Sequence, residues 1–253
     1  MAVLVCVNFA ACVETTSADG DGGGDGGGGS KRLKEIRTIG DGYVETVTYN
    51  YDEDGELIQA VEEEEGEDDG FSYKNVRTYK FHWTDNSIEI DREDDYGYGE
   101  SYTYSFTLAL EGGIVQSSIQ GSFNNVTSYN YNNGRIASID YGYNEDRLNW
   151  SSDKLMSLSY GDECREYSYG TTCSKGFFPL LGDLLNGEYS VLFGACPELI
   201  GARTNKLPTK VEVYYEGERY SSFTVSYKYN DGYVSQIIKK LGELSATTYI
   251  TWE

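Results

Sequence analysis

Along most of the chain, hydrophobic and polar residues alternate in short runs that end at glycine-containing turns. In the run 223–229, Phe, Val, Tyr and Tyr occupy every second position, with Thr, Ser and Lys between them. A period of two residues is typical of a β-strand that buries one face. Similar runs recur from residue 31 onward, without long helical segments between them. The sequence therefore predicts a single all-β domain over residues 31–253.

One motif recurs within these runs: two aromatic residues separated by one residue, a polar turn with Gly, and an aliphatic stretch. It is present at 49–57, 129–136 and 227–234, and in a degenerate form at 81–88. The Asn-Gly and Asp-Gly pairs tolerate the positive φ angles that tight hairpins require. Repeated hairpins predict an antiparallel meander. Because a long meander must close or cover its edges, we expect a sheet curled into a barrel-like roll.

The segment 176–200 breaks this alternation. It is densely apolar and contains Pro179, Pro197 and several glycines. This composition favours short helices and turns over regular strands, although a fully buried pair of strands is the alternative. We expect one or two short helices at about residues 177–200 that cap or plug the rolled sheet.

The first eleven residues form a short, mostly apolar run that leads into Ala10-Ala11-Cys12. Small residues before a cysteine are typical of the site where a bacterial signal peptide is cleaved and the cysteine is acylated. The run is too short to span a membrane, which takes about 20 apolar residues. It also lacks a basic n-region, which a segment further upstream would supply. The sequence predicts a signal peptide at 1–11 and lipidation of Cys12, with a buried N-terminal strand as the alternative.

Glycine and acidic residues dominate the segment after Cys12. The stretch Asp19–Ser30 is almost entirely Gly and Asp, a composition that cannot bury a core. We therefore expect residues 12–30 to tether the domain to a membrane. The formal net charge of −22 disfavours nucleic acid as a partner, because phosphates need a basic face. The acidic run from Glu62 to Asp69 is expected to be a solvated loop or hairpin tip, with a weak divalent-cation site as the alternative.

The sequence contains no recognisable catalytic or metal-binding motif. His82 is the only histidine, and the five cysteines show no CxxC pair. We expect no catalytic residue, no cofactor and no metal. Exposed aromatic side chains on a rigid sheet can bind sugar rings or peptides, whereas the alternative for each is a core or cross-strand contact. The candidates for ligand binding are Trp83, Trp150, Trp252, Tyr141 and Tyr143.

Together these features resemble the Bacteroidetes domain of unknown function 4595 family, which has a porin-like fold, and its lipoprotein type. The resemblance is carried by the aromatic repeat, by the apolar insert at 177–185, and by the segment Gly201–Pro208 that leads into a strand. It covers about residues 31–253. It implies a curled antiparallel sheet and a cell-envelope location, with no known activity. Because Thr, Ser, Lys, Asp and Glu separate the apolar positions, we expect no lipid-facing band of the kind that outer-membrane barrels show.

Three functions stay open. A non-catalytic binding or adhesion module for glycan or protein ranks first and a structural envelope protein second. A glycan-cleaving enzyme with paired carboxylates ranks third, because 42 acidic residues would create such pairs by chance. An aromatic-lined recess would favour the first, and a deep cleft with two close carboxylates the third. We expect the protein to be anchored by lipid to the outer membrane and exposed on the cell surface.

Overall fold

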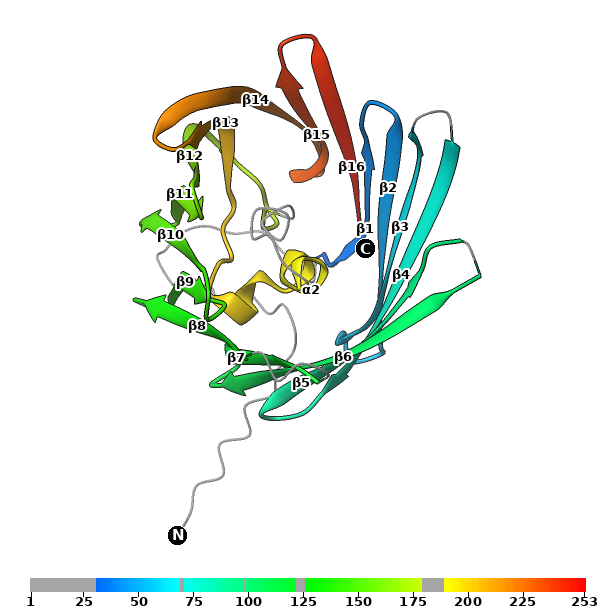
Figure 1. Ribbon diagram of the computed structural model, residues 1–253. Coiled ribbons are helices and arrows are strands. Elements are labelled where there is room, and N and C mark those ends of the chain that lie inside the picture. Colours follow the sequence, from blue (N-terminus) through cyan, green and yellow to red (C-terminus); the bar gives the residue numbers. More distant parts are fainter. Residues whose placement is uncertain (1–30, 69–70, 98, 122–125, 179–188) are drawn as a thin grey trace, which may run out of the picture.

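The computed structural model describes residues 31–68, 71–97, 99–121, 126–178 and 189–253. Sixteen antiparallel strands form a closed barrel in which each strand pairs with its sequence neighbours and β1 pairs with β16 (Figure 1). The strands are β1 (Leu33–Ile39), β2 (Tyr43–Tyr51), β3 (Leu57–Asp68), β4 (Phe71–Trp83), β5 (Ser87–Asp95), β6 (Ser101–Glu111), β7 (Ile114–Gln120), β8 (Val126–Asn132), β9 (Arg135–Asp140), β10 (Glu145–Ser151), β11 (Lys154–Tyr160), β12 (Glu163–Cys173), β13 (Lys206–Tyr215), β14 (Glu218–Asn230), β15 (Tyr233–Leu241) and β16 (Leu244–Trp252). The predicted meander of hairpins curled into a barrel is confirmed.

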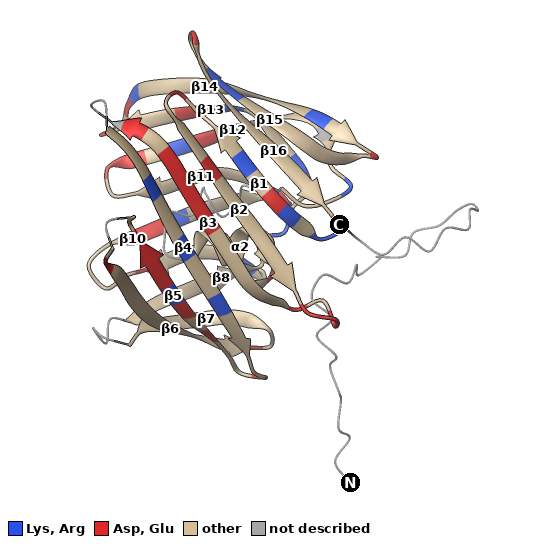
Figure 2. Ribbon diagram, turned by 90° about the vertical axis from the view of Figure 1, so that its right-hand side faces the viewer, with Lys and Arg blue, Asp and Glu red and all other residues tan. Residues whose placement is uncertain are grey.

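Alternation along each strand separates the inside of the barrel from the outside. On β5, Ile88 and Ile90 are buried, whereas Glu89 and Asp91 point outward and are exposed. Figure 2 shows Asp and Glu of β3 and β5 on either side of the Lys and Arg of β4. A lipid-facing barrel wall would carry an apolar band in this position. The charged outer wall of β3 to β5 therefore suits contact with water.

The connection between β12 and β13 runs into the barrel (Figure 1). It contains the helix α2 (Ser190–Ala195) and the 3-10 helix η1 (Pro197–Ile200). A barrel of 16 strands encloses more space than its own side chains can fill, and Leu192, Phe193 and Ile200 occupy part of it as buried residues. The prediction that short helices plug the roll is confirmed. Among the described residues, no helix is long and apolar enough to cross a membrane.

The first residues of the segment predicted to form short helices are buried without being helical. Phe177 and Phe178 are buried but not helical. The ring of Phe177 packs edge to face on Trp252 at a centroid distance of 5.4 Å. Residues 179–188, for which helical structure was also expected, lie outside the described residues, as do the signal peptide and tether predicted at 1–30.

Gly201 fixes the end of the plug against the barrel. It ends η1 in the left-handed conformation, with φ of 60°. A Cβ atom at this position would lie 1.9 Å from the carbonyl oxygen of Gly134 in the turn between β8 and β9. Only glycine therefore allows η1 to approach that turn so closely. Further along, Thr204 Oγ1 donates a hydrogen bond of 2.6 Å to the carbonyl of Asp153, which joins the segment Gly201–Pro208 to another turn at the same end.

The aromatic repeat has a structural cause. Near the end of seven even-numbered strands, a Tyr hydroxyl or Trp N–H donates a hydrogen bond to a backbone carbonyl of the preceding strand. The pairs are Tyr51 with Leu33, Trp83 with Leu57, Tyr131 with Val115, Trp150 with Ile136, Tyr169 with Leu155, Tyr227 with Pro208, and Trp252 with Val234. Each ring buries apolar surface while its polar atom satisfies a carbonyl. We call these residues the aromatic clamps.

Candidate functional site

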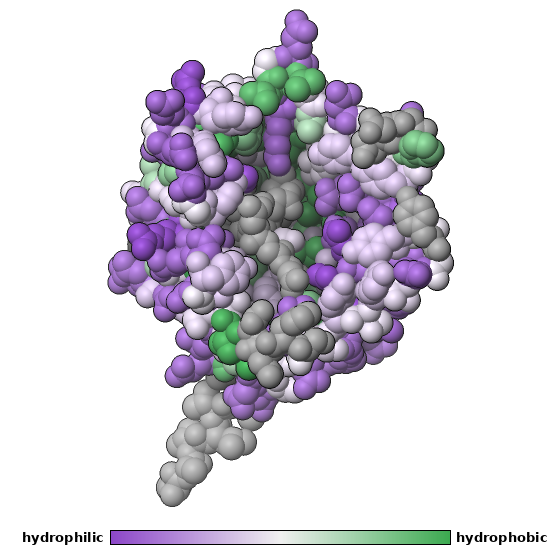
Figure 3. Space-filling view, viewed as in Figure 1, coloured by the Kyte–Doolittle hydropathy of each residue, from purple (hydrophilic) through white to green (hydrophobic). Residues whose placement is uncertain are grey.

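The two ends of the barrel differ in structure. The plugged end carries the aromatic clamps, the contact of η1 with Gly134, and both ends of the described chain, where Arg32 N–H donates to the carbonyl of Glu253 at 2.9 Å. The opposite end, which we call the mouth, carries the hairpin turns that come after the odd-numbered strands. Figure 3 looks into the mouth and shows hydrophobic patches at several points around its edge. The mouth is therefore the candidate functional site.

The inward face of β4 changes from apolar to polar as it approaches the mouth. Arg77 Nη1 lies 2.6 Å from Glu62 Oε1, and the hydroxyl of Tyr79 donates a 3.0 Å hydrogen bond to Glu62 Oε2. Burial raises the pKa of Tyr79 above its ordinary value of 10.0, and the nearby Glu62 carboxylate raises it as well. This phenol therefore stays protonated and serves as a donor.

These contacts correct one prediction. The acidic run is not a solvated loop or hairpin tip, because Glu62–Glu65 and Glu67 belong to strand β3. Glu62 points inward and is paired, while Glu63 points outward and contacts Lys74 at 3.0 Å. Within the described residues, no group of three or more His, Cys, Asp or Glu side chains could hold a metal ion.

On the neighbouring strand β5, Arg92 is held in a fixed orientation. Its guanidinium contacts Asp94 twice, with Nε to Oδ1 at 2.9 Å and Nη2 to Oδ2 at 3.1 Å. The same guanidinium lies over the ring of Tyr104 at 4.5 Å from its centroid. An ion pair with one hydrogen bond and a second close contact, stacked on an aromatic ring, restricts the orientation of the guanidinium. This wall of the mouth is therefore preorganised.

A second polar group lies on the other side of the barrel. β11 is seven strands from β4 in one direction and nine in the other, so the two walls face each other (Figure 1). Here Arg165 Nε contacts Glu163 Oε1 at 2.9 Å, and the Tyr160 hydroxyl also donates to Glu163. Nearby, the Tyr141 hydroxyl donates a 3.0 Å hydrogen bond to Asp146 Oδ2.

The two acidic groups on this wall have pKa values shifted in opposite directions. Burial raises the pKa of Asp146 above its ordinary value of 3.8, and the hydrogen bond from Tyr141 offsets this only in part. Burial acts on Glu163 in the same sense, but the hydrogen bonds from Tyr160 and Arg165 together outweigh it. The pKa of Glu163 therefore lies below its ordinary value of 4.5.

Replacing Asp146 by Asn should raise the free energy of unfolding at neutral pH, because no carboxylate is then desolvated. A raised folded-state pKa means that the folded protein holds the proton more tightly, so wild type gains stability below about 3.8 and loses it as pH rises. The advantage of Asp146→Asn should therefore shrink on acidification. Glu163→Gln should show the opposite sign at neutral pH, and its loss should disappear as pH falls through the lowered pKa. Urea unfolding of both variants across the acid range checks this, and parallel pH profiles would contradict it.

Large hydrophobic side chains gather at the outer edge of the mouth. Most of those that are exposed in the described residues lie at this end. They are Phe71, Tyr102, Ile119, Val126, Tyr143, Tyr215, Tyr220, Leu241 and Leu244, which we call the rim residues. Tyr143 and Tyr220 are 89% and 80% exposed, whereas the exposed tyrosine at the plugged end, Tyr229, is 38% exposed. Single exposed apolar residues are normal on a protein surface, but their concentration at one end makes the mouth the candidate site for an interaction.

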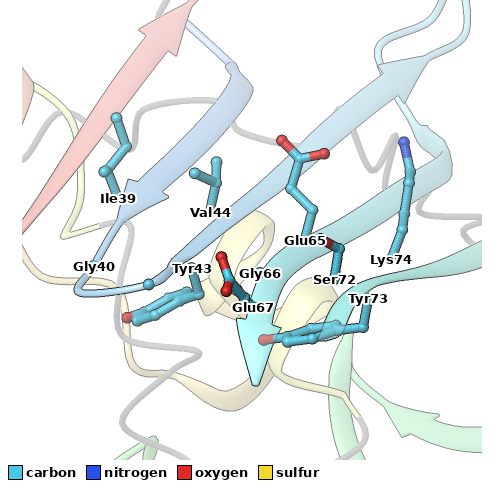
Figure 4. Close-up of a pocket in the computed structure, with 11 residues that line it drawn as sticks. Ile39, Gly40, Tyr43, Val44, Glu65, Gly66, Glu67, Ser72, Tyr73 and Lys74 are labelled. Carbon is cyan, nitrogen blue, oxygen red and sulfur yellow. The ribbon is translucent and has the colours of Figure 1, made fainter. Parts of the chain in front are cut away.

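A depression of about 720 Å³ opens on the rim where β1 to β4 approach the mouth (Figure 4). The sheet register places Tyr43, Gly66 and Tyr73 opposite one another on β2, β3 and β4. A Cβ atom on Gly66 would lie 2.8 Å from the Tyr73 hydroxyl oxygen, so the glycine leaves the space that this ring uses. Figure 4 shows the Tyr43 and Tyr73 rings on one side of the sheet, and Val44, Glu65 and Lys74 on the other.

Comparison with known proteins identifies the architecture. No known family model matches the chain, and no curated protein matches it in sequence. A porin-like protein from Bacteroides uniformis has a similar structure, with a TM-score of 0.62 at 16% identity over 87% of this chain and 98% of that one. The chain has a porin-like fold. A porin-like protein from Bacteroides vulgatus aligns over 88% of this chain and 99% of that one, with a TM-score of 0.43 at 12% identity.

Within this porin-like barrel, the predicted ligand-binding aromatics occupy different places. Trp83, Trp150 and Trp252 are partly buried aromatic clamps whose N–H groups are bonded to backbone carbonyls. Tyr141 lines the mouth beside Asp146, and its ring lies 6.4 Å from that of Tyr143 on the rim. The clamp contacts give the three tryptophans a structural role, and ligand binding by these residues stays a prediction. Cys12, the predicted lipidation site, lies outside the described residues.

The sequence reasoning missed the aromatics that define the mouth, namely Tyr43, Phe71, Tyr73 and Tyr220. The sequence signal that was missed is their position. Tyr43 and Phe71 directly follow Gly42 and Gly70 in the sequence, and each begins a strand. The clamps lie near the ends of even-numbered strands, whereas these four aromatics lie near the beginnings of even-numbered strands, at the mouth.

Proposed function

We propose that this protein is a non-catalytic binding module of the bacterial cell envelope that takes its ligand at the mouth of the barrel. The observation that carries the proposal is the concentration of the rim residues at this end, beside the paired polar side chains of Glu62, Asp94 and Glu163. Aromatic side chains offer large rigid contact surfaces at low cost in conformational entropy, and they dominate binding hot spots. The preorganised pairs inside the mouth add oriented donors and acceptors.

The plug supports binding over transport. Leu192, Phe193 and Ile200 are buried within the barrel, and Phe193 packs on Tyr129 of β8 at 5.9 Å between ring centroids. The mouth therefore leads to packed side chains. Under this proposal, the likeness to porins concerns shape, since a fold does not imply a function.

The state of the inward carboxylates supports a non-catalytic role. A glycan-cleaving enzyme needs one carboxyl group that donates a proton and a second carboxylate that attacks or activates water. At the mouth, Asp146, whose pKa is raised by burial, is hydrogen-bonded to Tyr141, whereas Glu62, Asp94 and Glu163 are each held by an arginine. Such pairs keep a carboxylate charged and oriented, which suits recognition better than proton transfer.

We also propose a lipid anchor at Cys12 and an outer-membrane location with the barrel exposed at the cell surface. The Ala10-Ala11-Cys12 sequence and the Gly/Asp tether support the anchor. The likeness to a porin-like protein of Bacteroides supports a cell-envelope location, and Gly201–Pro208 supports the family of domain of unknown function 4595. Because the chain enters β1 at the plugged end, an anchor there would leave the mouth free to face away from the membrane.

Replacing Tyr143 and Tyr220 together by Ser should weaken ligand binding by about tenfold or more, as expected when hot-spot aromatics are lost. The measurement is retention of the full-length protein on a glycan array and in pull-downs with solubilised envelope proteins. Tyr229→Ser is the matched control, because it removes an exposed tyrosine at the plugged end. Wild-type retention by the double rim variant would refute the mouth as the binding face.

A further inference from the structure

We infer that the ligand of the mouth is a basic polypeptide segment with apolar side chains, and that it docks where the β11–β12 and β13–β14 turns meet. This inference rests on the proposed function, because it names the partner class and the primary contact of the same mouth. The charges on the mouth turns and the exposed tyrosines beside them support it.

The turns of the mouth carry negative charge and no positive charge. Eight segments connect the strands at this end, namely 40–42, 69–70, 96–100, 121–125, 141–144, 161–162, 216–217 and 242–243. Six of these eight segments contain Asp or Glu, and none contains Lys or Arg. The acidic residues that the structure describes on these turns are all exposed, and they are Asp41, Glu100, Asp162, Glu216 and Glu243. Exposed carboxylates at one end attract a cationic partner and repel a polyanion.

Two of these turns lie side by side. The backbone N–H of Glu216 donates a 2.9 Å hydrogen bond to the carbonyl of Asp162, which joins the β13–β14 turn to the β11–β12 turn. Glu218 is exposed and pairs in register with Tyr215 across the β13–β14 hairpin, so a third carboxylate lies beside the other two. This junction therefore gathers negative charge at one point of the mouth.

The basic side chains of the same strands are engaged with other acids. Arg165 Nε contacts Glu163 Oε1 at 2.9 Å, and Arg219 Nη1 contacts Glu212 Oε1 at 3.3 Å. Lys240 of the neighbouring strand β15 pairs in register with Thr224, further along β14. Among the ion pairs of the described residues, none involves a carboxylate of the junction. These carboxylates are left for a cation that a partner supplies.

Exposed apolar surface flanks the carboxylates of the junction. Tyr215 is 53% exposed and Tyr220 is 80% exposed, and the next turn of the mouth carries the exposed side chains of Leu241 and Leu244. A tyrosine ring attracts the cation of Lys or Arg over its face, and it packs on the aliphatic stem of either side chain. A metal ion would use the carboxylates alone, and no group of three or more His, Cys, Asp or Glu in the described residues could hold one. A basic polypeptide uses the carboxylates and the apolar surface together, as arginine and tyrosine do in protein interfaces.

Fluorescence anisotropy of the full-length protein with labelled peptides tests the inference. One peptide carries Arg at its polar positions and Leu at its apolar positions, and a second peptide of the same length has Glu in place of each Arg. We expect the Arg peptide to bind and the Glu peptide not to bind. Because salt screens exposed charges, the affinity for the Arg peptide should fall by about tenfold or more from about 50 mM to about 500 mM NaCl. A third peptide, with Ser in place of each Leu, should bind about tenfold more weakly than the Arg peptide with Leu.

A pair of charge variants locates the site. Asp162→Asn with Glu216→Gln should weaken binding of the Arg peptide by about fivefold, as expected when two exposed ion pairs are lost. Glu53→Gln with Asp54→Asn is the matched control, because it removes one exposed Glu and one exposed Asp from the β2–β3 turn at the plugged end. It changes the net charge by the same amount and should bind within about twofold of wild type.

Each other outcome overturns the inference and separates it from the proposed function. Equal binding of the Arg and Glu peptides, or binding of neither, refutes the partner class, and equal losses in the two charge variants refute the site. Spermine that binds as tightly as the Arg peptide refutes a polypeptide ligand. If Tyr143→Ser with Tyr220→Ser still abolishes retention of a glycan or an envelope protein, the mouth remains the binding face and only the inference fails. Thermal unfolding of the charge variants confirms that their barrels are intact.

Discussion

Replacing Phe193 by Ala should lower the free energy of unfolding by about 3–5 kcal/mol, the range for a large aromatic removed from a packed core. Phe193 is buried, and its ring contacts Tyr129 at 5.9 Å and Tyr189 at 6.0 Å between centroids. The interior of a 16-stranded barrel is too wide to collapse around the lost volume. Most of the cavity should therefore persist, which places the cost near the upper end of the range. Chemical denaturation monitored by tyrosine and tryptophan fluorescence measures it.

Two further variants determine whether the plug belongs to the core. Leu192→Ala removes a buried leucine from the same helix and should cost about 2–5 kcal/mol. Leu244→Ala is the control, because this rim leucine is 58% exposed and its loss should stay within about 0.5 kcal/mol. Denaturation midpoints for Phe193→Ala and Leu192→Ala that match wild type would show that α2 is a removable segment that the barrel does not need.

The parts of the fold that depend on local pattern were predictable. Period-two alternation identified strands such as the run 223–229, and Gly-containing turns identified hairpins. Closure was expected because the edges of a sheet must be covered. The number of strands was not predicted, and the pairing of β1 with β16 joins residues more than 200 positions apart. Such a pairing depends on curvature accumulated over the whole sheet. No single hairpin sequence specifies it.

The acidic run shows why local reasoning failed elsewhere. A block of Glu residues was expected to stay solvated, because like charges repel. In the barrel, however, the partners come from the next strand: Arg77 and Tyr79 bind Glu62 from inside, and Lys74 binds Glu63 from outside. Alternation divides the block between two faces, so that each carboxylate meets different neighbours. These partners depend on cross-strand register, which composition alone does not reveal.

The sequence predicted that the candidate site would be rich in aromatic residues, but it did not identify the residues that form it. An aromatic-rich surface could be expected from 24 tyrosines, but the sequence did not show which aromatics were structural. Trp83 and Trp150 were predicted as ligand-binding candidates, yet the N–H group of each donates a hydrogen bond to a backbone carbonyl of the preceding strand. Tyr43 and Tyr73 acquire their arrangement from β3, which places Gly66 between them. That arrangement is a property of three paired strands.

Replacing Cys12 by Ala should move the protein almost completely from the membrane fraction to the soluble fraction of cells that express it with its native leader. The expected change is large because a lipid chain contributes about 0.8 kcal/mol per buried CH₂ group, whereas the outer wall of β3 to β5 is charged. Cys6→Ala is the matched control, since it changes a cysteine within the predicted signal peptide and should leave partitioning unchanged. Immunoblots of separated fractions measure the shift, and a Cys12→Ala protein that stays with membranes would rule out this anchor.

Wild type and the Cys6→Ala variant also test whether the mouth faces away from the membrane. Residues 13–30 would form a tether with a root-mean-square length of about 20–25 Å, estimated for a flexible Gly-rich chain. Such a tether would join the barrel beside Arg32 at the plugged end, and the rim lies at the opposite end of the barrel. On intact cells, a soluble protease or biotinylating reagent should therefore reach the rim tyrosines of wild type and Cys6→Ala alike. Labelling that appears only after the cells are lysed would place the mouth away from the cell surface.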